Sequence, residues 1–243
     1  MGKLIVVEGT DCSGKETQTN MLMERLKRDG YSVCKFSFPM YDTPTGKIIG
    51  ACLLGKPHMC EELLQENHSF FPEGGGNIDP LVAIALYAAD RRYNLPRIME
   101  ALDNNDVLIL DRYVPSNMAH RGGLAKNKLE RKYIYESIEK EEYDINEMPR
   151  PDKTILLYMP YEQACILKQN RKEKPDETET NEEYLRRGEE AYLELAEMYK
   201  YDVINCTDNE RIRTIEEINE DVYQSVLSML KKNDFKRKLD FRK

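Results

Sequence analysis

The chain has 243 residues, of which 33% are charged, and a formal net charge of −8. This length suits one large α/β domain with a substantial core and no need for disulfides. The acidic balance excludes a whole-molecule field that would attract nucleic acid or an anionic membrane.

The sequence has no sign of a membrane anchor or of an oxidising compartment. No apolar run reaches the roughly 18 residues that a membrane span requires, and the first residues are typical of a strand rather than a signal peptide. The cysteines show no metal-site spacing and indicate reduced thiols in a cytoplasmic protein. They are Cys12, Cys34, Cys52, Cys60, Cys165 and Cys206.

Short apolar runs alternate with helical patterns along the chain, which is typical of a parallel sheet wrapped by helices. We therefore expect an α/β fold with three layers, in which helices flank a five-stranded parallel sheet. The expected strands are residues 4–7, 32–36, 107–110, 154–158 and 203–205. The expected helices are residues 15–28, 45–54, 80–102, 128–142, 161–170, 181–199 and 214–230.

These elements form one expected domain, residues 1–230, with two interruptions and a tail. Residues 57–79 are an irregular, glycine-rich insertion, and the polar stretch around residues 170–181 is a candidate mobile lid. The basic tail, residues 231–243, is either a solvated extension or a nucleic-acid contact; we favour the extension, because no nucleic-acid-binding motif accompanies it.

The segment IVVEGTDCSGKET, residues 5–17, is an apolar strand that runs into a glycine-punctuated loop and then a helix. Backbone N–H groups of such a loop form a nest for phosphate, and Lys15 adds a compact positive charge. The alternative is a glycine-rich turn with a surface lysine. The predicted ATP-binding residues are Gly9, Thr10, Asp11, Cys12, Ser13, Gly14, Lys15, Glu16 and Thr17.

One position departs from the phosphate-loop pattern. Glu16 stands where a Ser or Thr hydroxyl would ligate Mg²⁺. Either the Glu16 carboxylate, Thr17 or a water fills that role, and the sequence leaves these alternatives open.

A second group of polar residues follows the apolar run 107–110. Asp111 lies at the carboxyl edge of the expected sheet, where open α/β folds bind ligands, and an acid there holds the metal in phosphate-loop proteins. The Arg112 guanidinium can grip a second phosphate bidentately. Alternatively, the two residues are an Asp–Arg pair that only closes a strand end.

These motifs together resemble those of the thymidylate kinase family. The similarity extends from residue 3 to about residue 220. The segments that carry it are EGTDCSGK at 8–15, FPMY at 38–41, YAADR at 87–91, DRYVPSN at 111–117 and YLELA at 192–196.

The resemblance implies how the nucleotide monophosphate, dTMP, is held. Tyr87 would stack on thymine and Arg91 would donate to a base carbonyl; the two lie four residues apart on one helix face. Without the family match, they read as a core tyrosine and a helix-terminal arginine. Other implied contacts are Asp11 to the 3′-hydroxyl, Tyr41 and Arg112 to the phosphoryl group, Phe38 and Pro39 as the pocket wall, and Ser116 and Asn117 as its polar floor.

Two further departures concern the substrate and the lid. His120 stands where many members carry a tyrosine; its ring either fills the same space against a 2′-hydroxyl or is a plain helix histidine. Cys12 occupies a position where some members place a catalytic arginine, so we expect Arg171 of the lid, assisted by Lys172 or Lys174, to supply that charge.

The resemblance implies transfer of the γ-phosphoryl group of ATP to dTMP, giving dTDP and ADP, with Mg²⁺ as cofactor. Lys15, Arg112, Arg171 and Asp111 would carry the catalysis. Homodimers are common in the family, and the helix 81–89, apolar all round, is expected to be buried. The alternatives are a kinase for another deoxynucleotide or a nucleoside, and a nucleotide-binding regulatory module with weakened activity.

Overall fold

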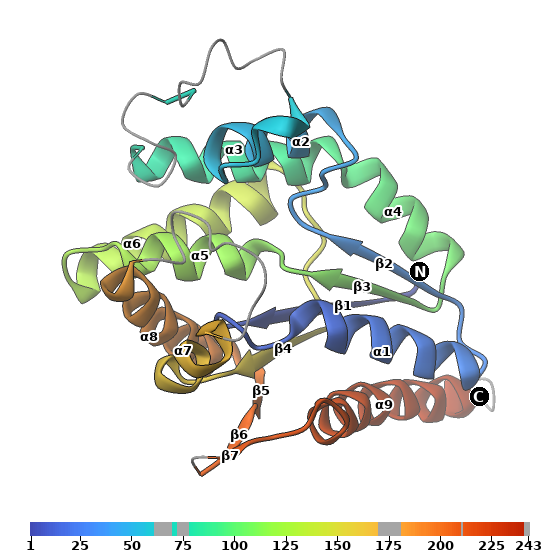
Figure 1. Cartoon of the computed structure of the whole chain (residues 1–243). Coiled ribbons are helices and arrows are strands. Elements are labelled where there is room, and N and C mark those ends of the chain that lie inside the picture. Colours follow the sequence, from blue (N-terminus) through green and yellow to red (C-terminus); the bar gives the residue numbers. More distant parts are fainter. Residues whose placement is uncertain (61–69, 72–77, 170–180, 210, 241–243) are drawn as a thin grey trace.

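The structure, a computed structural model, describes residues 1–60, 70–71, 78–169, 181–209 and 211–240. Its centre is a five-stranded parallel sheet in the order β2-β3-β1-β4-β5, with helices on both faces (Figure 1). The predicted three-layer α/β fold is confirmed. The strands are β1 Lys3–Gly9, β2 Val33–Ser37, β3 Val107–Asp111, β4 Lys153–Tyr158 and β5 Asp202–Asn205.

The first strand is buried on both faces because it lies in the middle of the sheet. Its side chains alternate: Leu4 and Val6 pack into the core under one layer of helices, and Ile5 and Val7 into the core under the other. The register sets Val7 opposite Asp111. The carboxyl ends of β1 and β3 therefore meet at one edge, where both predicted phosphate motifs begin.

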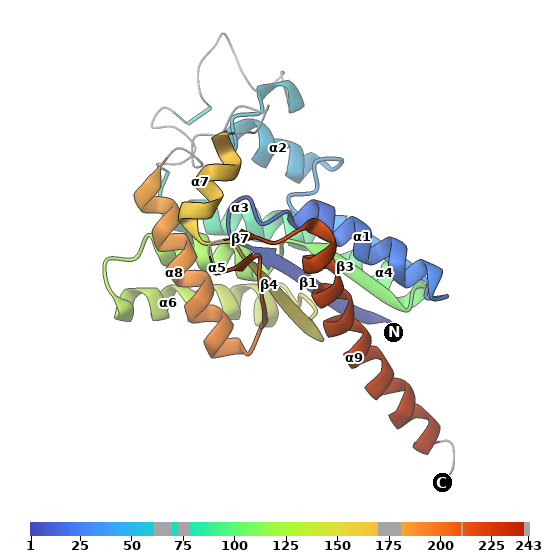
Figure 2. The ribbon, with the colours of Figure 1, turned by 60° about the horizontal axis from the view of Figure 1, so that its bottom comes forward.

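Two helices far apart in the sequence cover one face together. These are α1, Lys15–Arg28, and α9, Ile215–Asp240, which lie side by side in both views (Figure 2). Leu22 and Leu26 of α1 share a buried cluster with Val222 of α9. α9 continues ten residues beyond the predicted end at 230, to Asp240.

The other face is covered by a larger group of helices, whose buried side chains join one cluster with Leu4, Val6 and Leu110. The helices of this group are α4 Leu95–Asn104, α5 Val114–Gly123, α6 Lys128–Glu139 and α8 Glu182–Tyr199. α5 packs on α8 and α6.

The prediction of a single helix over residues 80–102 is wrong. The structure has α3, Pro80–Tyr93, followed by α4, with Asn94 between them. Asn94 donates its side-chain amide to the Asp90 carbonyl at 2.8 Å, and a proline occupies the first turn of α4, where its missing N–H costs nothing.

Burial of α3 on all sides is also contradicted. Leu81 is 63% exposed and Val82 45% exposed, whereas Ala83 and Ile84 are buried. The helix is apolar all round, but only one side of it packs on the protein.

Two elements near the site differ from the sequence-based expectation. The predicted helix 128–142 ends at Glu139, and the π-helical turn η3, Lys140–Ile145, follows it. Helix α5 was not among the predicted helices, because its sequence VPSNMAHRGG has proline, polar residues and glycines that weaken helix propensity.

No described helix combines the length and apolar character needed to cross a bilayer. The predicted lid falls largely on residues 170–180 and the insertion largely on 61–69 and 72–77, which are outside the described residues. The remaining described elements are short. They are α2 Pro44–Leu53, η1 Pro57–Met59, α7 Tyr161–Gln169, and the hairpin of β6 Thr207–Asp208 with β7 Arg211–Ile212.

Candidate active site

The predicted phosphate loop joins the end of β1 to the start of α1. Gly14, at the N-cap of α1, has a φ of 73°, in the left-handed region that favours glycine. At Gly9, a Cβ atom would lie 2.9 Å from the Leu157 carbonyl oxygen, so only glycine fits the close approach to β4. Both glycines of the motif are thus required by the path of the backbone.

Lys15 lies at the first turn of α1, with its ammonium group folded over the loop. It donates to the carbonyls of Gly9 at 3.0 Å and Thr10 at 3.2 Å. Burial, assisted by the positive charge of Arg112, lowers the pKa of Lys15 to about 8, although Asp111 and Asp11 act in the opposite direction. A phosphate bound in the loop would bring further negative charge to this buried ammonium and favour its charged form.

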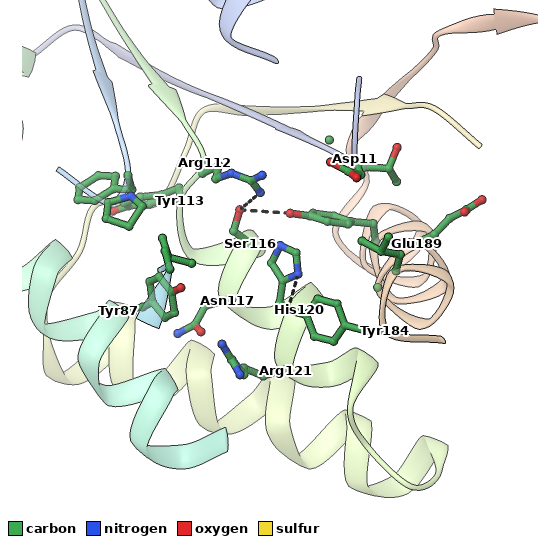
Figure 3. A pocket seen from close by; sticks show the side chains of 18 of the residues that line it. Asp11, Tyr87, Arg112, Tyr113, Ser116, Asn117, His120, Arg121, Tyr184 and Glu189 are labelled. Carbon is green, nitrogen blue, oxygen red and sulfur yellow. Dashed lines mark hydrogen bonds between the residues drawn. The ribbon is translucent and has the colours of Figure 1, made fainter. Parts of the chain in front are cut away.

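A cavity of about 300 Å³ opens beside the loop, between α3, α5 and α8 (Figure 3). All of the residues predicted to bind dTMP line it, although they come from distant segments. They are Asp11, Phe38, Pro39, Tyr41, Tyr87, Arg91, Arg112, Ser116, Asn117 and His120.

Only some of the predicted ATP-binding residues line the cavity. Gly9, Thr10 and Asp11 line the cavity. The others, Cys12, Ser13, Gly14, Lys15, Glu16 and Thr17, do not, and neither does the predicted metal ligand Asp111. Glu16 and Thr17 are exposed on the first turn of α1.

Arg112 follows β3 directly and has a φ of 65°, a left-handed conformation that is strained for arginine. Its Nη1 lies 3.5 Å from the Ser116 hydroxyl. Burial opposes the charge, but the electrostatic influence of Tyr192, Glu8, Asp111 and Asp11 outweighs it and raises the pKa of Arg112. The Arg112 guanidinium therefore stays positively charged in the cavity that Gly9 and Thr10 of the phosphate loop also line.

Glu8 organises this region and was assigned no role from the sequence. Its fully buried carboxylate accepts from the backbone N–H groups of Tyr113 at 2.8 Å and Ser116 at 3.1 Å, at the start of α5. It also accepts from the hydroxyls of Ser116 at 2.6 Å and Tyr192 at 3.0 Å. A carboxylate at a helix N-terminus supplies the cap that Tyr113 does not provide, so Glu8 fixes where α5 begins.

Two lysines join the site in addition to Lys15. Lys168, near the end of α7, forms an ion pair with Asp11 at 2.5 Å. Lys56 lines the cavity and donates to the Tyr41 hydroxyl at 3.2 Å, with its ammonium 4.3 Å from the Tyr41 ring centroid. Neither lysine is part of a recognisable motif, and only the folded chain brings them to Asp11 and Tyr41.

Arg91 lines the cavity, but most of its guanidinium is already engaged. Its Nε donates to both carboxylate oxygens of Glu142, each at 2.9 Å, and Nη2 bonds to the same carboxylate. Both side chains are buried. Burial opposes the charge, but Glu142 outweighs it and raises the pKa of Arg91. The bidentate pair ties α3 to the π-helical turn η3.

His120 is a neutral ring within an aromatic group. Its Nδ1 lies 3.1 Å from the Tyr184 hydroxyl, and the two rings stack with centroids 5.8 Å apart. Burial, together with the charges of Arg112 and Arg121, keeps the pKa of His120 well below its usual value. The ring lines the cavity, so the space-filling alternative is consistent with its position.

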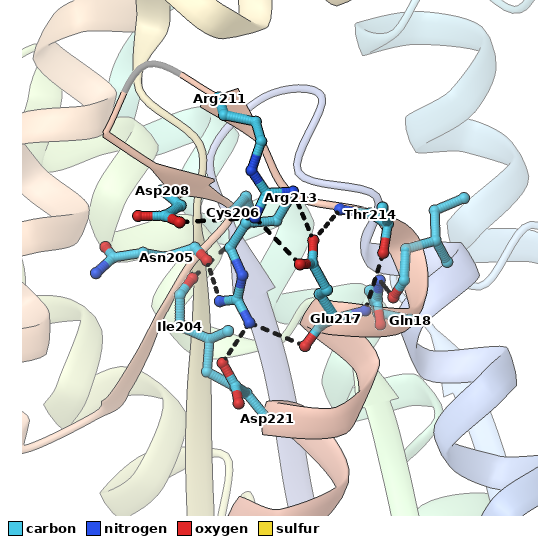
Figure 4. A network of polar contacts seen from close by, with 11 residues as sticks. Gln18, Ile204, Asn205, Cys206, Asp208, Arg211, Arg213, Thr214, Glu217 and Asp221 are labelled. Atoms are coloured by element: carbon cyan, nitrogen blue, oxygen red, sulfur yellow. Dashed lines mark hydrogen bonds and ion pairs between the residues drawn. The ribbon is translucent and has the colours of Figure 1, made fainter.

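A polar network supports the other side of the phosphate loop (Figure 4). Arg213 donates to the carbonyls of Asn205 at 2.7 Å and Glu217 at 2.9 Å and pairs with Asp221 at 2.7 Å. It thus fastens the end of β5 to α9. The Cys206 thiol, 3.9 Å from the Ser13 carbonyl, places this junction against the loop.

The donor set for a metal ion is small. The structure shows no cluster of three or more His, Cys, Asp or Glu side chains in the part of the chain that it describes. Asp111, at the end of β3, is buried, and its negative charge acts to raise the pKa of Lys15. One carboxylate beside a phosphate loop fits Mg²⁺, which is usually bound by one or two carboxylates, substrate phosphates and waters.

Comparison with known proteins agrees with this geometry. The family model for thymidylate kinase matches residues 7–219. The chain is 31% identical to the thymidylate kinase of Prochlorococcus marinus strain MIT 9312, over 88% of this chain and 92% of that protein. It is 30% identical to a probable thymidylate kinase of Pyrococcus abyssi, over 91% and 94% of the two chains.

A solved structure shows the same fold. The thymidylate kinase of Candida albicans superposes with a TM-score of 0.67 at 21% identity, covering 93% of this chain and 92% of that one. The match of the family model to most of the sequence is the stronger finding. The chain belongs to the thymidylate kinase family.

Proposed function

We propose that this protein transfers the γ-phosphoryl group of ATP to dTMP, giving dTDP and ADP, and that the cavity beside the phosphate loop holds the dTMP. Membership of the family supports the reaction. The observation that carries the placement is that residues from four separate motifs, all assigned to dTMP, line one cavity that also reaches Gly9 and Thr10 of the phosphate loop.

The phosphates would meet between Lys15 and Arg112. The loop N–H groups and Lys15 bind the donor phosphates, and Arg112, with Tyr41 and Lys56, holds the acceptor phosphate. A phosphate oxygen is already an anionic nucleophile, so positioning and charge neutralisation supply the catalysis, and no strong general base is needed.

Mg²⁺ belongs to this proposal as the cofactor that neutralises charge on the donor phosphates. Asp111 is the carboxylate best placed to hold it. Glu16 and Thr17 stay candidate ligands, although both lie exposed on α1 away from the cavity. Arg171, the proposed lid arginine, lies outside the described residues.

At the sugar, Asp11 is the proposed acceptor for the 3′-hydroxyl. One of its oxygens accepts from the Cys12 N–H at 3.0 Å, and the other pairs with Lys168. Lys168 thus orients the Asp11 carboxylate. Phe38, Tyr87 and His120 would enclose the deoxyribose and base.

Two properties of the whole protein are also proposed. We infer a homodimer through α3, because Leu81, Ala85 and Ala89 recur every fourth residue on its exposed side and form an apolar stripe. A cytoplasmic location is supported by the cysteines, since all six are described and none forms a disulfide.

A coupled assay of ADP release with dTMP, dUMP, dCMP, dGMP and thymidine tests the function. The proposal expects the fastest turnover with dTMP and none with Lys15→Ala. Fastest turnover on thymidine would indicate a nucleoside kinase instead. Binding of ATP and dTMP without formation of ADP or dTDP would indicate a regulatory module.

A further inference from the structure

The backbone conformation of Arg112 has to be held by the residues around it. Its φ of 65° lies in the left-handed region, which an arginine seldom occupies because the conformation costs free energy. Such residues persist where the surrounding structure fixes them. The Arg112 N–H donates to the Val7 carbonyl at 3.1 Å, and the N–H of the next residue, Tyr113, donates to the Glu8 carboxylate at 2.8 Å. Arg112 is thus fastened to β1 by its own N–H group and by that of its neighbour.

Glu8 fixes this segment with one of its carboxylate oxygens. Oε1 accepts from the N–H groups of both Tyr113, at 2.8 Å, and Ser116, at 3.1 Å. These are backbone donors, so only an acceptor can satisfy them, and Tyr113 offers no side-chain cap to α5. Glu8 is fully buried and does not line the cavity. Any effect of Glu8 on a bound ligand must therefore pass through the residues that it contacts.

The other carboxylate oxygen of Glu8 reaches the Arg112 side chain through Ser116. Oε2 accepts from the Ser116 hydroxyl at 2.6 Å and from the Tyr192 hydroxyl at 3.0 Å. Because the Ser116 proton points to Glu8, the Ser116 oxygen presents a lone pair to Nη1 of Arg112, 3.5 Å away (Figure 3). No carboxylate among the described residues forms an ion pair with Arg112. Its guanidinium is thus oriented by a neutral hydroxyl, and its N–H groups stay available to a phosphate.

We propose that Glu8 is a positioning residue for the acceptor phosphate. By accepting the two N–H groups it holds Arg112 in the left-handed conformation, and through Ser116 it directs the guanidinium into the cavity. The phosphate then meets a guanidinium that is already in place, so less ordering is needed when dTMP binds. This inference rests on the proposed function, in which Arg112 holds that phosphate.

A purely structural role for Glu8, as the cap of α5, would affect ligands differently. α5 also carries Asn117 and His120, which line the cavity where the nucleoside is proposed to lie. Met118 and Ala119 pack in the same buried cluster as Leu110, so the body of α5 is held independently of Glu8. Loss of the Glu8 contacts should therefore disturb Arg112 and leave the nucleoside contacts unchanged, whereas a general loss of α5 would disturb both.

The test compares dTMP with thymidine, which differs from dTMP only in lacking the phosphate. The equilibrium Kd of each ligand is measured by calorimetry, without ATP, for wild type, Glu8→Ala, Glu8→Gln and Asn219→Ala. Loss of a positioned, charge-assisted contact to the phosphate predicts that Glu8→Ala raises the Kd of dTMP by about 10- to 100-fold. The Kd of thymidine is expected to change by less than about threefold, so the preference for dTMP falls by nearly the full factor.

Two variants serve as controls. Glu8→Gln keeps an oxygen for the two N–H groups and is expected to retain the preference of wild type within about threefold. Asn219→Ala removes an equally buried polar side chain from α9, outside the cavity lining, and should match wild type with both ligands.

Equal weakening of dTMP and thymidine in Glu8→Ala would show a structural role and overturn the proposal. An unchanged preference in Glu8→Ala, or a preference in Glu8→Gln as low as in Glu8→Ala, would also overturn it. If Glu8→Ala does not fold, Glu8→Asp decides in the same way, because its shorter side chain withdraws the carboxylate from the two N–H groups. Wild type that binds dTMP no more tightly than thymidine, or that releases no ADP with dTMP, would instead contradict the proposed function.

Discussion

The lowered pKa of Lys15 predicts an unusual pH dependence of ATP binding. In most phosphate-binding sites a lysine is charged throughout the neutral range, because its ordinary pKa is near 10.4. Here burial and Arg112 bring the pKa to about 8 in the absence of ligand. The negative phosphates of ATP favour the charged form, so the bound state takes up a proton whenever free Lys15 is neutral.

The direction and size of the pH effect on ATP affinity follow from this uptake of a proton by Lys15. The affinity for ATP is highest below the pKa of free Lys15 and falls as the pH rises through about 8. The protonated fraction of free Lys15 drops from about nine-tenths at pH 7 to about one-tenth at pH 9, so Kd should rise about tenfold over that interval. The terminal phosphate of ATP, with a pKa of about 6, contributes little in this range.

The measurement is the equilibrium Kd of ATP by calorimetry, without dTMP, at half-unit steps from pH 7 to 9.5. Lys15→Arg is the matched control, because a guanidinium stays charged over this range and should give a nearly flat curve whatever its absolute affinity. A flat curve for wild type, or the same slope in Lys15→Arg, would refute the account of Lys15.

Three further predictions concern the core, the lid and the dimer. Glu142→Ala leaves the Arg91 guanidinium buried and unpaired, so the free energy of unfolding by urea should fall by about 3–5 kcal/mol. The exposed Glu147→Ala should change it by less than about 0.5 kcal/mol, and equal effects would contradict the assigned role of the buried pair. Arg171→Ala should lower kcat by at least about tenfold with nearly unchanged dTMP affinity, because its contact forms mainly in the transition state; unaltered turnover would refute this. Leu81→Glu should shift a dimer to monomer in sedimentation velocity, and a dimer of unchanged stability would exclude the α3 face.

The sequence predicted the sheet and the residues around the cavity well, for a physical reason. Strands of a parallel sheet are continuous apolar runs, and each of the five was recognised within about two residues of its observed ends. Local motifs such as Gly9–Lys15 and Asp111–Arg112 follow those strands directly. The carboxyl edge of the sheet therefore had to bring them together.

What the sequence did not reveal depends on contacts between distant residues. Helix α5 begins where Glu8, 105 positions earlier, caps Tyr113, and nothing local indicates that cap. Glu142 lies 51 positions from the arginine it binds. Such long-range polar contacts leave no periodic pattern in either segment, so propensity alone missed α5. The break at Asn94 has a local cause instead, the Asn94 side chain on the Asp90 carbonyl and the proline in the first turn of α4, and the apolar pattern that continues across it hid that signal.

The most direct test of the account is a crystal structure with dTMP and a non-hydrolysable ATP analogue. We predict that the dTMP phosphate contacts Arg112 and faces the terminal phosphate of the analogue over Gly9–Lys15, with thymine stacked on Tyr87 and its carbonyl on the side of Arg91. Thymidylate bound outside the cavity, or with its base at Arg112 and its phosphate at Tyr87, would contradict this arrangement.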